Sequence, residues 1–597
     1  MVGGVDLKEQ AKLADIEFVR SLKWTPKCGG RTGKAVRKAA KRGDKAAFVL
    51  AQRAFLEPFA EKFRKRVQSL KRPLAVLSLP ESAPHSLSSL VATEFADARV
   101  GAGRFGLGRS IHNWLRSVSL SKPIVGPDLL LALEMLVDSP IDIEIETWLR
   151  LWRVCLVSIP EVGKKATEPD LIHAESRMMA SLVFQLLDGT DELFHGTSSS
   201  LSSILTKITD TNGAPRMDVV TNLRRWLTSF VRVMTWGRSF GRDVLDETAA
   251  KRFRLFVACG ADLCMRGRFA FEPPGGRSGQ DVLAIGAKVA KWSAKSEVGA
   301  LARGVMQKTR KRCRSIPFPA VQSDWAEVSY LRSDRSLDAD LIAVGHSGPA
   351  VQIDMSCLGE DLLRGDWNST IHIHGKVVTT DAAWTCSCWH SDHDGDYLEL
   401  QQLNSGVRVE RQLFLSRKQH FALVMESVIT QKSQALSTEI ELPLAATTMA
   451  RADYISREWR VHAGDVPVRV FPVSLDFDRV QSANGELRIE AGCMRYSLQG
   501  NRTLQAAMVL DWHPKRRTSE AEWCQVTVTE SRRILKAAEA AAFRLRINDH
   551  HLFSYRNLNG STELRAVLGQ HMANETMIGI FADGDVEPLV LVDFDQG

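Results

Sequence analysis

The chain has 597 residues, of which 44% are hydrophobic and 25% are charged, and its formal net charge at pH 7 is +8. This length is more than one hydrophobic core organises, so we expect two large globular domains. No run of about 18 apolar residues occurs, which excludes a transmembrane helix, and the ten cysteines are too scattered for a disulfide scaffold. Charges interrupt residues 1–20, which predicts a cytoplasmic protein without a signal peptide; a misassigned start would instead allow a periplasmic or extracellular one.

A basic helical arm is predicted over residues 1–84. In residues 26–73, lysines and arginines greatly outnumber the acids Asp44, Glu57 and Glu61. Apolar residues recur at helical spacing here, which favours amphipathic helices with a solvated basic face. Alternatively, the charge marks a contact surface for a polyanion such as nucleic acid, acidic polysaccharide or phospholipid head groups. The sequence carries no signature of a nucleic-acid-binding fold, which disfavours nucleic acid as the partner.

A helical domain is predicted over residues 85–312. Several segments carry apolar residues at i, i+3, i+4 and i+7, among them DLLLALEMLV, IETWLRLWRVCLVSI and VVTNLRRWLTSFVRVM. Short breaks such as DSP and DTNGAP join them. A succession of helical hairpins without strands indicates a helical array, which is a bundle, a solenoid or a closed toroid.

A β domain is predicted over residues 322–597, because the period of the hydrophobic pattern there changes to two. Segments such as VRVERQLFLSR, HFALVMESVI and AAFRLRIND alternate apolar and polar residues between turns. This pattern is typical of antiparallel sheets with one solvated face. The charged, proline-containing segment 308–324 is the predicted boundary between the two domains.

Three consecutive segments resemble the β domain of the heparinase II/III-like polysaccharide lyases. They read VQIDMSCLGEDLLRGDW, NSTIHIHGK and DGDYLELQQLNSGVRVERQLFLSRKQHFALVMESV, and the resemblance covers about residues 325–430. In the helical half, HAESRMMASLVFQLLDG and TDTNGAPRMDVVTNLRRW are similar to that family's toroid more weakly. The resemblance implies an α+β multidomain fold, in which an N-terminal α/α toroid-like helical domain precedes a C-terminal antiparallel β-sandwich.

The family's activity is β-elimination in uronate-containing, and therefore acidic, polysaccharides. The reaction needs a group that neutralises the uronate carboxylate, a base for the C5 proton and an acid for the leaving oxygen. Members of the family use an Asn or Arg for the carboxylate, and a toroid Tyr with a β-domain His for the protons. None of this chain's tyrosines lies in the helical half, where Leu223 stands nearest to the expected position, and the usual toroid Asn is also missing. The five tyrosines are Tyr330, Tyr397, Tyr454, Tyr496 and Tyr555.

The resemblance therefore implies a substitute set of site residues. The catalytic candidates are His346, His173 and Arg216, and the substrate-binding candidates are Arg224, Glu175 and Trp226. The residues by themselves also allow ordinary structural roles: a lone histidine before a strand is often a turn donor, and a tryptophan in a helix often fills the core.

The stretch WTCSCWHSDHDGDYLELQ, residues 384–401, raises the question of a metal. His372 and His374 share one strand face, as do Cys386, Cys388 and His390, because side chains alternate along a strand. If these strands form a hairpin, zinc is a candidate cofactor, with ligands drawn from His372, His374 and His390. The alternative is a metal-free strand whose Trp384, Cys386 and Cys388 face the core, followed by an exposed turn that carries Asp392, Asp394 and Asp396.

Three functions stay open from the sequence. The first is a lyase of acidic polysaccharide, and the second is a non-catalytic glycan-binding or scaffold protein of the same fold. The third, which the sequence favours least, is a nucleic-acid-associated protein that uses the basic arm. The sequence does not indicate an oligomeric state.

Overall fold

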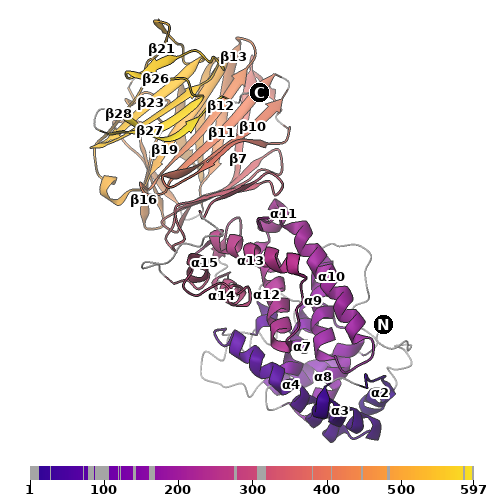
Figure 1. Ribbon diagram of the computed structural model, residues 1–597. Coiled ribbons are helices and arrows are strands. Elements are labelled where there is room, and N and C mark those ends of the chain that lie inside the picture. Colours follow the sequence, from indigo (N-terminus) through magenta and orange to yellow (C-terminus); the bar gives the residue numbers. More distant parts are fainter. Residues whose placement is uncertain are drawn as a thin grey trace. The chain divides into compact units, whose positions relative to one another are not determined.

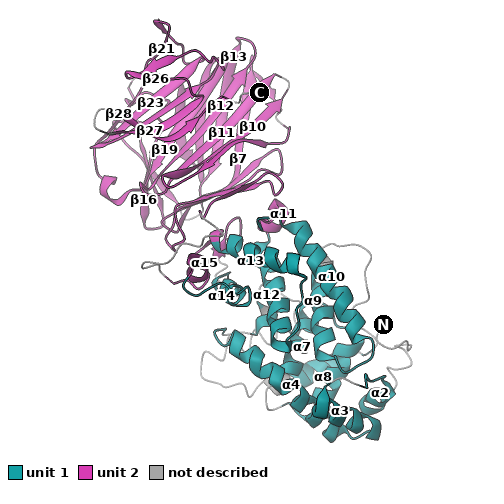
Figure 2. Cartoon of the chain, in the orientation of Figure 1, with its two compact units in different colours: residues 1–213, 222–261, 276–295 teal, residues 214–221, 262–275, 296–597 magenta. Residues whose placement is uncertain are grey.

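The computed structural model describes most of the chain (Figure 1). The described residues are 13–26, 29–70, 73–77, 86–87, 107–118, 120, 123–138, 143–159, 168–273, 279–305, 318–379, 381–404, 406–445, 448–480, 484–582 and 585–594. The chain forms two compact units (Figure 2). The helical unit comprises residues 1–213, 222–261 and 276–295, and the sheet unit comprises residues 214–221, 262–275 and 296–597.

The helical unit contains the helices that the 3.6-residue pattern predicts and several others, such as the one over residues 190–208, that the pattern did not single out. They are α2 (Asp15–Ser21), α3 (Gly30–Arg42), α4 (Lys45–Val67), the 3-10 turn η1 (Leu74–Val76), α6 (Leu107–Ser117), α7 (Pro127–Val137), α8 (Ile145–Val157), α9 (Glu168–Val183), α10 (Thr190–Ile208), α12 (Leu223–Phe240), α13 (Glu247–Asp262) and α14 (Gly279–Val289). Among the described residues, no helix is both long enough and apolar enough to cross a membrane.

The basic segment folds as part of this helical unit. Gly43 ends α3 in the left-handed conformation, and the Asp44 side chain then caps α4 by accepting a hydrogen bond of 3.0 Å from the Ala47 N–H. Arg53 of α4 donates a hydrogen bond of 2.7 Å to the Ile143 carbonyl, which lies just before α8. Residues 1–84 therefore share one compact unit with the helices that follow, and the expected limits at 84, 85 and 312 lie outside the described residues.

The sheet unit is a stack of four antiparallel sheets (Figure 1). The nine-stranded sheet contains β3 (Val321–Ser323), β4 (Val328–Arg332), β5 (Leu341–Gly345), β6 (Val351–Cys357), β7 (Glu360–Ile373), β8 (Lys376–Val378), β13 (Ala435–Pro443), β17 (Gly485–Glu490) and β18 (Cys493–Asn501). The eight-stranded sheet contains β9 (Thr385–Ser391), β10 (Gly395–Asn404), β11 (Val407–Ser416), β12 (Phe421–Thr430), β14 (Met449–Ala452), β15 (Trp459–Ala463), β16 (Val466–Phe471) and β19 (Thr503–Asp511).

Two smaller sheets complete the stack. The five-stranded sheet contains β20 (Ala521–Gln525), β23 (Ala540–Ile547), β24 (His550–Asn557), β27 (Thr576–Ala582) and β28 (Asp585–Val592). The four-stranded sheet contains β21 (Val528–Glu530), β22 (Arg533–Ile534), β25 (Arg565–Val567) and β26 (Gln570–Met572). The short elements β1 (Cys264–Met265), β2 (Arg268–Phe269), α11 (Met217–Val220) and α15 (Glu297–Leu301) also belong to the sheet unit.

Three hydrophobic cores separate the four sheets, so the eight-stranded sheet is buried on both faces. Leu398 and Val424 of this sheet join the core shared with the nine-stranded sheet. Their neighbours Tyr397 and Leu423 join the core shared with the five-stranded sheet. The expectation of sheets with one solvated face is wrong for this layer: the alternating residues of its central strands enter two different cores rather than one core and solvent.

Candidate functional site

The turn between β3 and β4 carries the most exposed tryptophan of the described residues, and the sequence reasoning did not single it out. Trp325 is 50% exposed and is flanked by the exposed acids Asp324 and Glu327. The turn is tight, because the Ala326 N–H donates to the Ser323 hydroxyl oxygen at 3.2 Å and Glu327 has a φ of 54°. This rigid turn holds a large apolar ring in solvent. The local sequence signal was a tryptophan close to two acids in SDWAEV, at the start of the β domain.

Helix α11 packs against this turn and places Arg216 in the sheet unit. The Met217 N–H donates a hydrogen bond of 3.0 Å to the Ala326 carbonyl. The Met217 side chain lies against Gly345 so closely that a Cβ there would be 2.3 Å from the methionine sulfur. Arg216 itself is exposed and donates through Nε to Asp218 Oδ1 at 3.0 Å. The hydrogen bond that Arg216 donates to Asp218 is the largest effect that raises the pKa of Arg216, and the charge of Glu327 adds to it.

His346 follows β5 on the same side of the turn. Its backbone N–H donates to the Glu327 carbonyl at 2.9 Å, and its side chain is only 3% exposed. Neither ring nitrogen makes a hydrogen bond of good geometry with the described residues. Burial lowers the pKa of His346, and the negative charge of Asp324 only partly opposes this effect. Burial therefore favours the neutral form of the imidazole.

The same turn also influences a neighbouring thiol. Burial raises the pKa of Cys386 to about 12, and the Asp324 charge is the next cause. The thiol stays protonated at neutral pH, so it is neither a nucleophile nor a ready metal ligand. We call Arg216, Asp324, Trp325, Glu327 and His346 the turn cluster, since the β3–β4 turn links all five. It combines an exposed aromatic face, an exposed guanidinium and a neutral imidazole.

The other predicted site residues belong to the helical unit. Glu175 of α9 is fully buried and accepts from Arg232 Nη2 at 3.1 Å, while Arg232 Nη1 donates to the Leu77 carbonyl at 2.8 Å. This ion pair joins α9 to α12 and leaves the Glu175 carboxylate without access to solvent. His173 on α9, and Arg224 and Trp226 on α12, are half-buried. The structure thus places Arg216 and His346 beside one turn, whereas these four residues belong to the other unit.

Tyrosine hydroxyls offer little for proton transfer. Tyr330, Tyr397, Tyr496 and Tyr555 are each at most 1% exposed, and the Tyr397 hydroxyl donates to Glu399 Oε2 at 2.7 Å. Burial raises the pKa of Tyr397 further, so its proton is held more tightly. Only Tyr454 is open to solvent, at 83% exposure. Four of the five phenols are therefore closed to a polymer in solution.

The hairpin on which the predicted zinc site depended does not form. β7, which carries His372, lies in the nine-stranded sheet, whereas β9, which carries His390, pairs with β10 in the eight-stranded sheet. His374 lies in the turn after β7 with a φ of 50°. Among the described residues, the sets of three ligand atoms close enough for one metal ion do not include His372, His374 and His390. The donors present do not fit the predicted zinc site.

A β-bulge also separates the two cysteines of the Cys-x-Cys stretch. Cys388 pairs with Glu399 and Cys386 with Leu400, so Ser387 is the extra residue. Cys386 consequently packs on the core beside the nine-stranded sheet, and Cys388 packs on the core beside the five-stranded sheet. The expectation of a shared face is wrong, because the bulge reverses the alternation. Asp396 is also fully buried rather than part of an exposed turn, and it accepts a hydrogen bond of 2.7 Å from the Ser391 hydroxyl.

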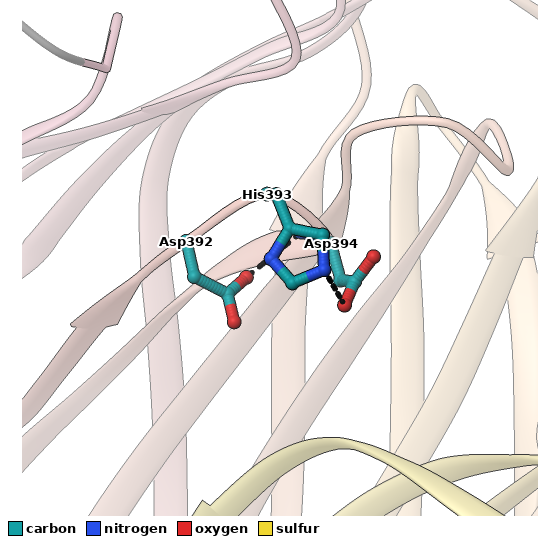
Figure 3. Close-up of side chains that lie close together, drawn as sticks. All are labelled: Asp392, His393 and Asp394. Atoms are coloured by element: carbon teal, nitrogen blue, oxygen red, sulfur yellow. Dashed lines mark hydrogen bonds and ion pairs between the residues drawn. The ribbon is translucent and has the colours of Figure 1, made fainter.

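Figure 3 shows the group that does come together, Asp392, His393 and Asp394 in the turn between β9 and β10. Asp392 accepts hydrogen bonds from the backbone N–H groups of Asp394 and Gly395, at 2.8 and 3.1 Å. Asp394 is 3.2 Å from the ammonium group of Lys418. These carboxylates are bonded by their own turn and a lysine, which is the arrangement of a capped surface turn.

No protein-family model and no curated protein matches the sequence. Solved structures do match. Heparan sulfate lyase HepC from Pedobacter heparinus has a TM-score of 0.57 at 10% identity, over 90% of this chain and 98% of that chain. A heparinase III has a TM-score of 0.56 at 9% identity, over 90% and 99%. Another heparinase III has a TM-score of 0.53 at 9% identity, over 93% and 88%. The chain has the fold of these polysaccharide lyases, which confirms the predicted helical toroid-like domain followed by a β-sandwich.

Proposed function

We propose that this protein binds an acidic, uronate-containing polysaccharide at the turn cluster of the sheet unit. The proposal rests on two exposed groups in a chain with the fold of heparan sulfate lyases: the indole of Trp325 in the β3–β4 turn and the guanidinium of Arg216. The hydrogen bond from the Met217 N–H to the Ala326 carbonyl ties the segment of Arg216 to that turn. An indole presents a flat apolar face on which the C–H face of a sugar ring can stack. A guanidinium can meet a carboxylate or sulfate with two parallel hydrogen bonds.

The charges of the cluster limit the strength of a single contact. Arg216 already pairs with Asp218, so a uronate must share or displace that carboxylate. An exposed ion pair contributes only about 0–1 kcal/mol. We therefore expect weak binding to one sugar unit and stronger binding to a polymer, because several weak contacts act together.

Binding is better supported than catalysis because the residues for proton transfer are incomplete. Elimination needs a base and an acid that both reach the sugar. The helical half has no tyrosine, and the described structure leaves only Tyr454 exposed among the five. The expected substrate-binding Glu175 is bonded to Arg232 in the interior.

A β-eliminating lyase is the second candidate function, and one observation favours it. The buried imidazole of His346 is neutral and its ring nitrogens have no hydrogen bond of good geometry, which suits a general base. In this reaction His346 takes the C5 proton, Arg216 neutralises the carboxylate, a C4–C5 double bond forms and the C4–O bond breaks. The leaving oxygen then takes a proton from water. Movement of the loop that follows His346 would have to expose the ring.

Trp325→Ala tests the binding proposal. We expect the affinity of the full chain for heparan sulfate or alginate to fall about threefold to tenfold, the amount that one aromatic stack contributes. Tyr454→Ala is the matched control, since it removes another exposed aromatic ring of the sheet unit. Equal affinity of wild type and Trp325→Ala for both polymers would refute the proposal. The lyase candidate predicts ultraviolet absorbance from an unsaturated uronate with wild-type protein and none with His346→Ala.

A further inference from the structure

Helix α3 presents a row of unpaired cations. The exposed residues Arg31, Lys34, Lys38, Lys41 and Arg42 lie on the face opposite to its buried residues, and we call them the cationic stripe. Their spacing of three or four residues places them along one side of the helix. With a rise of 1.5 Å per residue, the stripe is about 16 Å long. The helix contains thirteen residues and no acid among them.

The neighbouring helix shows that these cations differ from ordinary surface lysines. In α4, the Lys45 ammonium lies 3.1 Å from Glu146, and the Lys65 ammonium lies 2.7 Å from Glu61. Arg64 of α4 lies 3.1 Å from Asp138. In contrast, no residue of the cationic stripe forms an ion pair with any residue that the structure describes. The charge of the cationic stripe is thus not balanced by an ion pair within the described part of the protein.

The cationic stripe lowers the stability of α3. Like charges three and four residues apart destabilise a helix by about 0.2–0.5 kcal/mol per pair, and cations near its N-terminus oppose the helix dipole. Burial of Val36, Ala39 and Ala40 offsets this repulsion. At Gly29, which caps the helix with a φ of 82°, a Cβ would lie 2.7 Å from the Leu186 side chain. The helix is therefore held firmly against its own unit, and its charged face is directed away from the packed one.

The shape of the stripe distinguishes between classes of polyanion. A membrane-surface helix inserts its apolar face, but the apolar face of α3 is already buried. A surface that binds single-stranded nucleic acid combines cations with aromatic side chains on which the bases stack, and α3 contains no aromatic residue. A single row of cations matches a single-chain polyanion, in which acidic groups follow one another along one line.

We propose that the cationic stripe of α3 is a second, electrostatic binding surface for acidic polysaccharide. This inference rests on the proposed function, because the polymer is the ligand assigned to the turn cluster. The stripe supplies sequence-independent attraction to carboxylate or sulfate groups, whereas the turn cluster contacts individual sugar rings. Attraction between exposed charges is screened within about 10 Å at 0.1 M salt, so the contribution of the stripe falls as salt rises.

The test uses the full chain with Lys34→Gln, Lys38→Gln and Lys41→Gln combined. Glutamine keeps the helix propensity of lysine and removes only the charge. We expect the affinity for heparan sulfate at low salt to fall about tenfold, with a shallower dependence of log Kd on log salt, as expected when cations that release counterions are lost. The matched control combines Lys376→Gln, Lys432→Gln and Lys515→Gln, three exposed lysines of the sheet unit, and should change the affinity less than about twofold.

The outcomes separate this inference from the proposed function. If the stripe variant keeps wild-type affinity and salt dependence while Trp325→Ala weakens binding, the stripe proposal fails and the turn cluster stands. If the stripe variant loses affinity and Trp325→Ala does not, the stripe is supported and the turn cluster fails. If wild-type protein binds a DNA duplex or phosphatidylserine vesicles through the stripe but neither heparan sulfate nor alginate, both proposals are overturned.

Discussion

Two arginines of this protein use their charge in opposite ways. Arg232 is 1% exposed and donates hydrogen bonds to Glu175 and the Leu77 carbonyl in the interior of the helical unit. Arg216 is exposed on the sheet unit, where Asp218 is its hydrogen-bond partner. Arg232 is hydrogen-bonded on several sides and stabilises the fold, whereas Arg216 retains N–H groups that can donate to a ligand. Burial and bonding partners, rather than residue type, decide which charged groups of this protein are accessible to a ligand.

Breaking the buried pair should have the largest effect. Glu175→Ala leaves the Arg232 charge buried without its carboxylate, and we expect the free energy of unfolding to fall by about 3–5 kcal/mol, as measured by urea denaturation. Glu57→Ala, which removes an exposed partner of Arg64, is the control and should cost less than about 1 kcal/mol. A loss below 1 kcal/mol for Glu175→Ala would show that Arg232 does not depend on this carboxylate.

A substitution that displaces α11 should change the position of Arg216 without altering Arg216 itself. A valine at position 345 would collide with the Met217 side chain, which holds α11 and therefore Arg216 beside the β3–β4 turn. We expect Gly345→Val to lower the free energy of unfolding by about 1–3 kcal/mol and to weaken heparan sulfate binding. Gly348→Val is the control, because a Cβ at Gly348 meets no atom within 4 Å. Unchanged binding by a folded Gly345→Val protein would argue against Arg216 as a contact.

Two histidines, His346 and His420, also differ in burial and partners, and this difference should appear in the pH dependence of stability. These effects should be the smallest. Burial lowers the pKa of His346, so this residue favours the folded state above the unfolded pKa and that stabilisation is lost as pH falls through the folded pKa. The hydrogen bond that His420 donates to Asp340 raises the pKa of His420. That pair therefore stabilises the fold fully below the unfolded pKa, and the gain is lost as pH rises through the folded pKa.

The two variants should therefore respond oppositely to acid. Between pH 8 and about pH 5, His346→Gln should lose less stability than wild type, and His420→Gln should lose more. Thermal unfolding across this interval measures both differences. Parallel pH curves for wild type and His346→Gln would contradict a buried neutral imidazole at this position.

Local periodicity predicted much of the fold. The helical spacing in residues 46–63 became α4, and the change of period after residue 322 became the stacked sheets. A strand buried on both faces has a nearly continuous apolar sequence rather than an alternating one, as in residues 421–425 of β12, so the second core was recorded in the sequence but not in a period-two pattern. The bulge at Ser387 was invisible, since one extra residue leaves no mark in composition.

The site was less predictable than the fold. His346 and Arg216 were found through the family resemblance, and the structure places them beside one turn. Glu175 was found in the same way but pairs with Arg232, a partner 57 residues away that only packing could reveal. Trp325 was overlooked because a single tryptophan carries no periodic signal, and its importance comes from exposure, which the sequence does not record.

The eight-stranded sheet is buried on both faces, and this burial limits where the protein can acquire new ligand contacts. Its central strands offer no flat surface to a ligand, so any contact that this sheet makes with a ligand is restricted to its edges and to the turns that join its strands. Residues in those turns can be substituted without repacking the two cores that this sheet borders. New ligand specificity in such a protein should therefore arise from substitutions in its loops, while the stacked sheets and their cores stay the same.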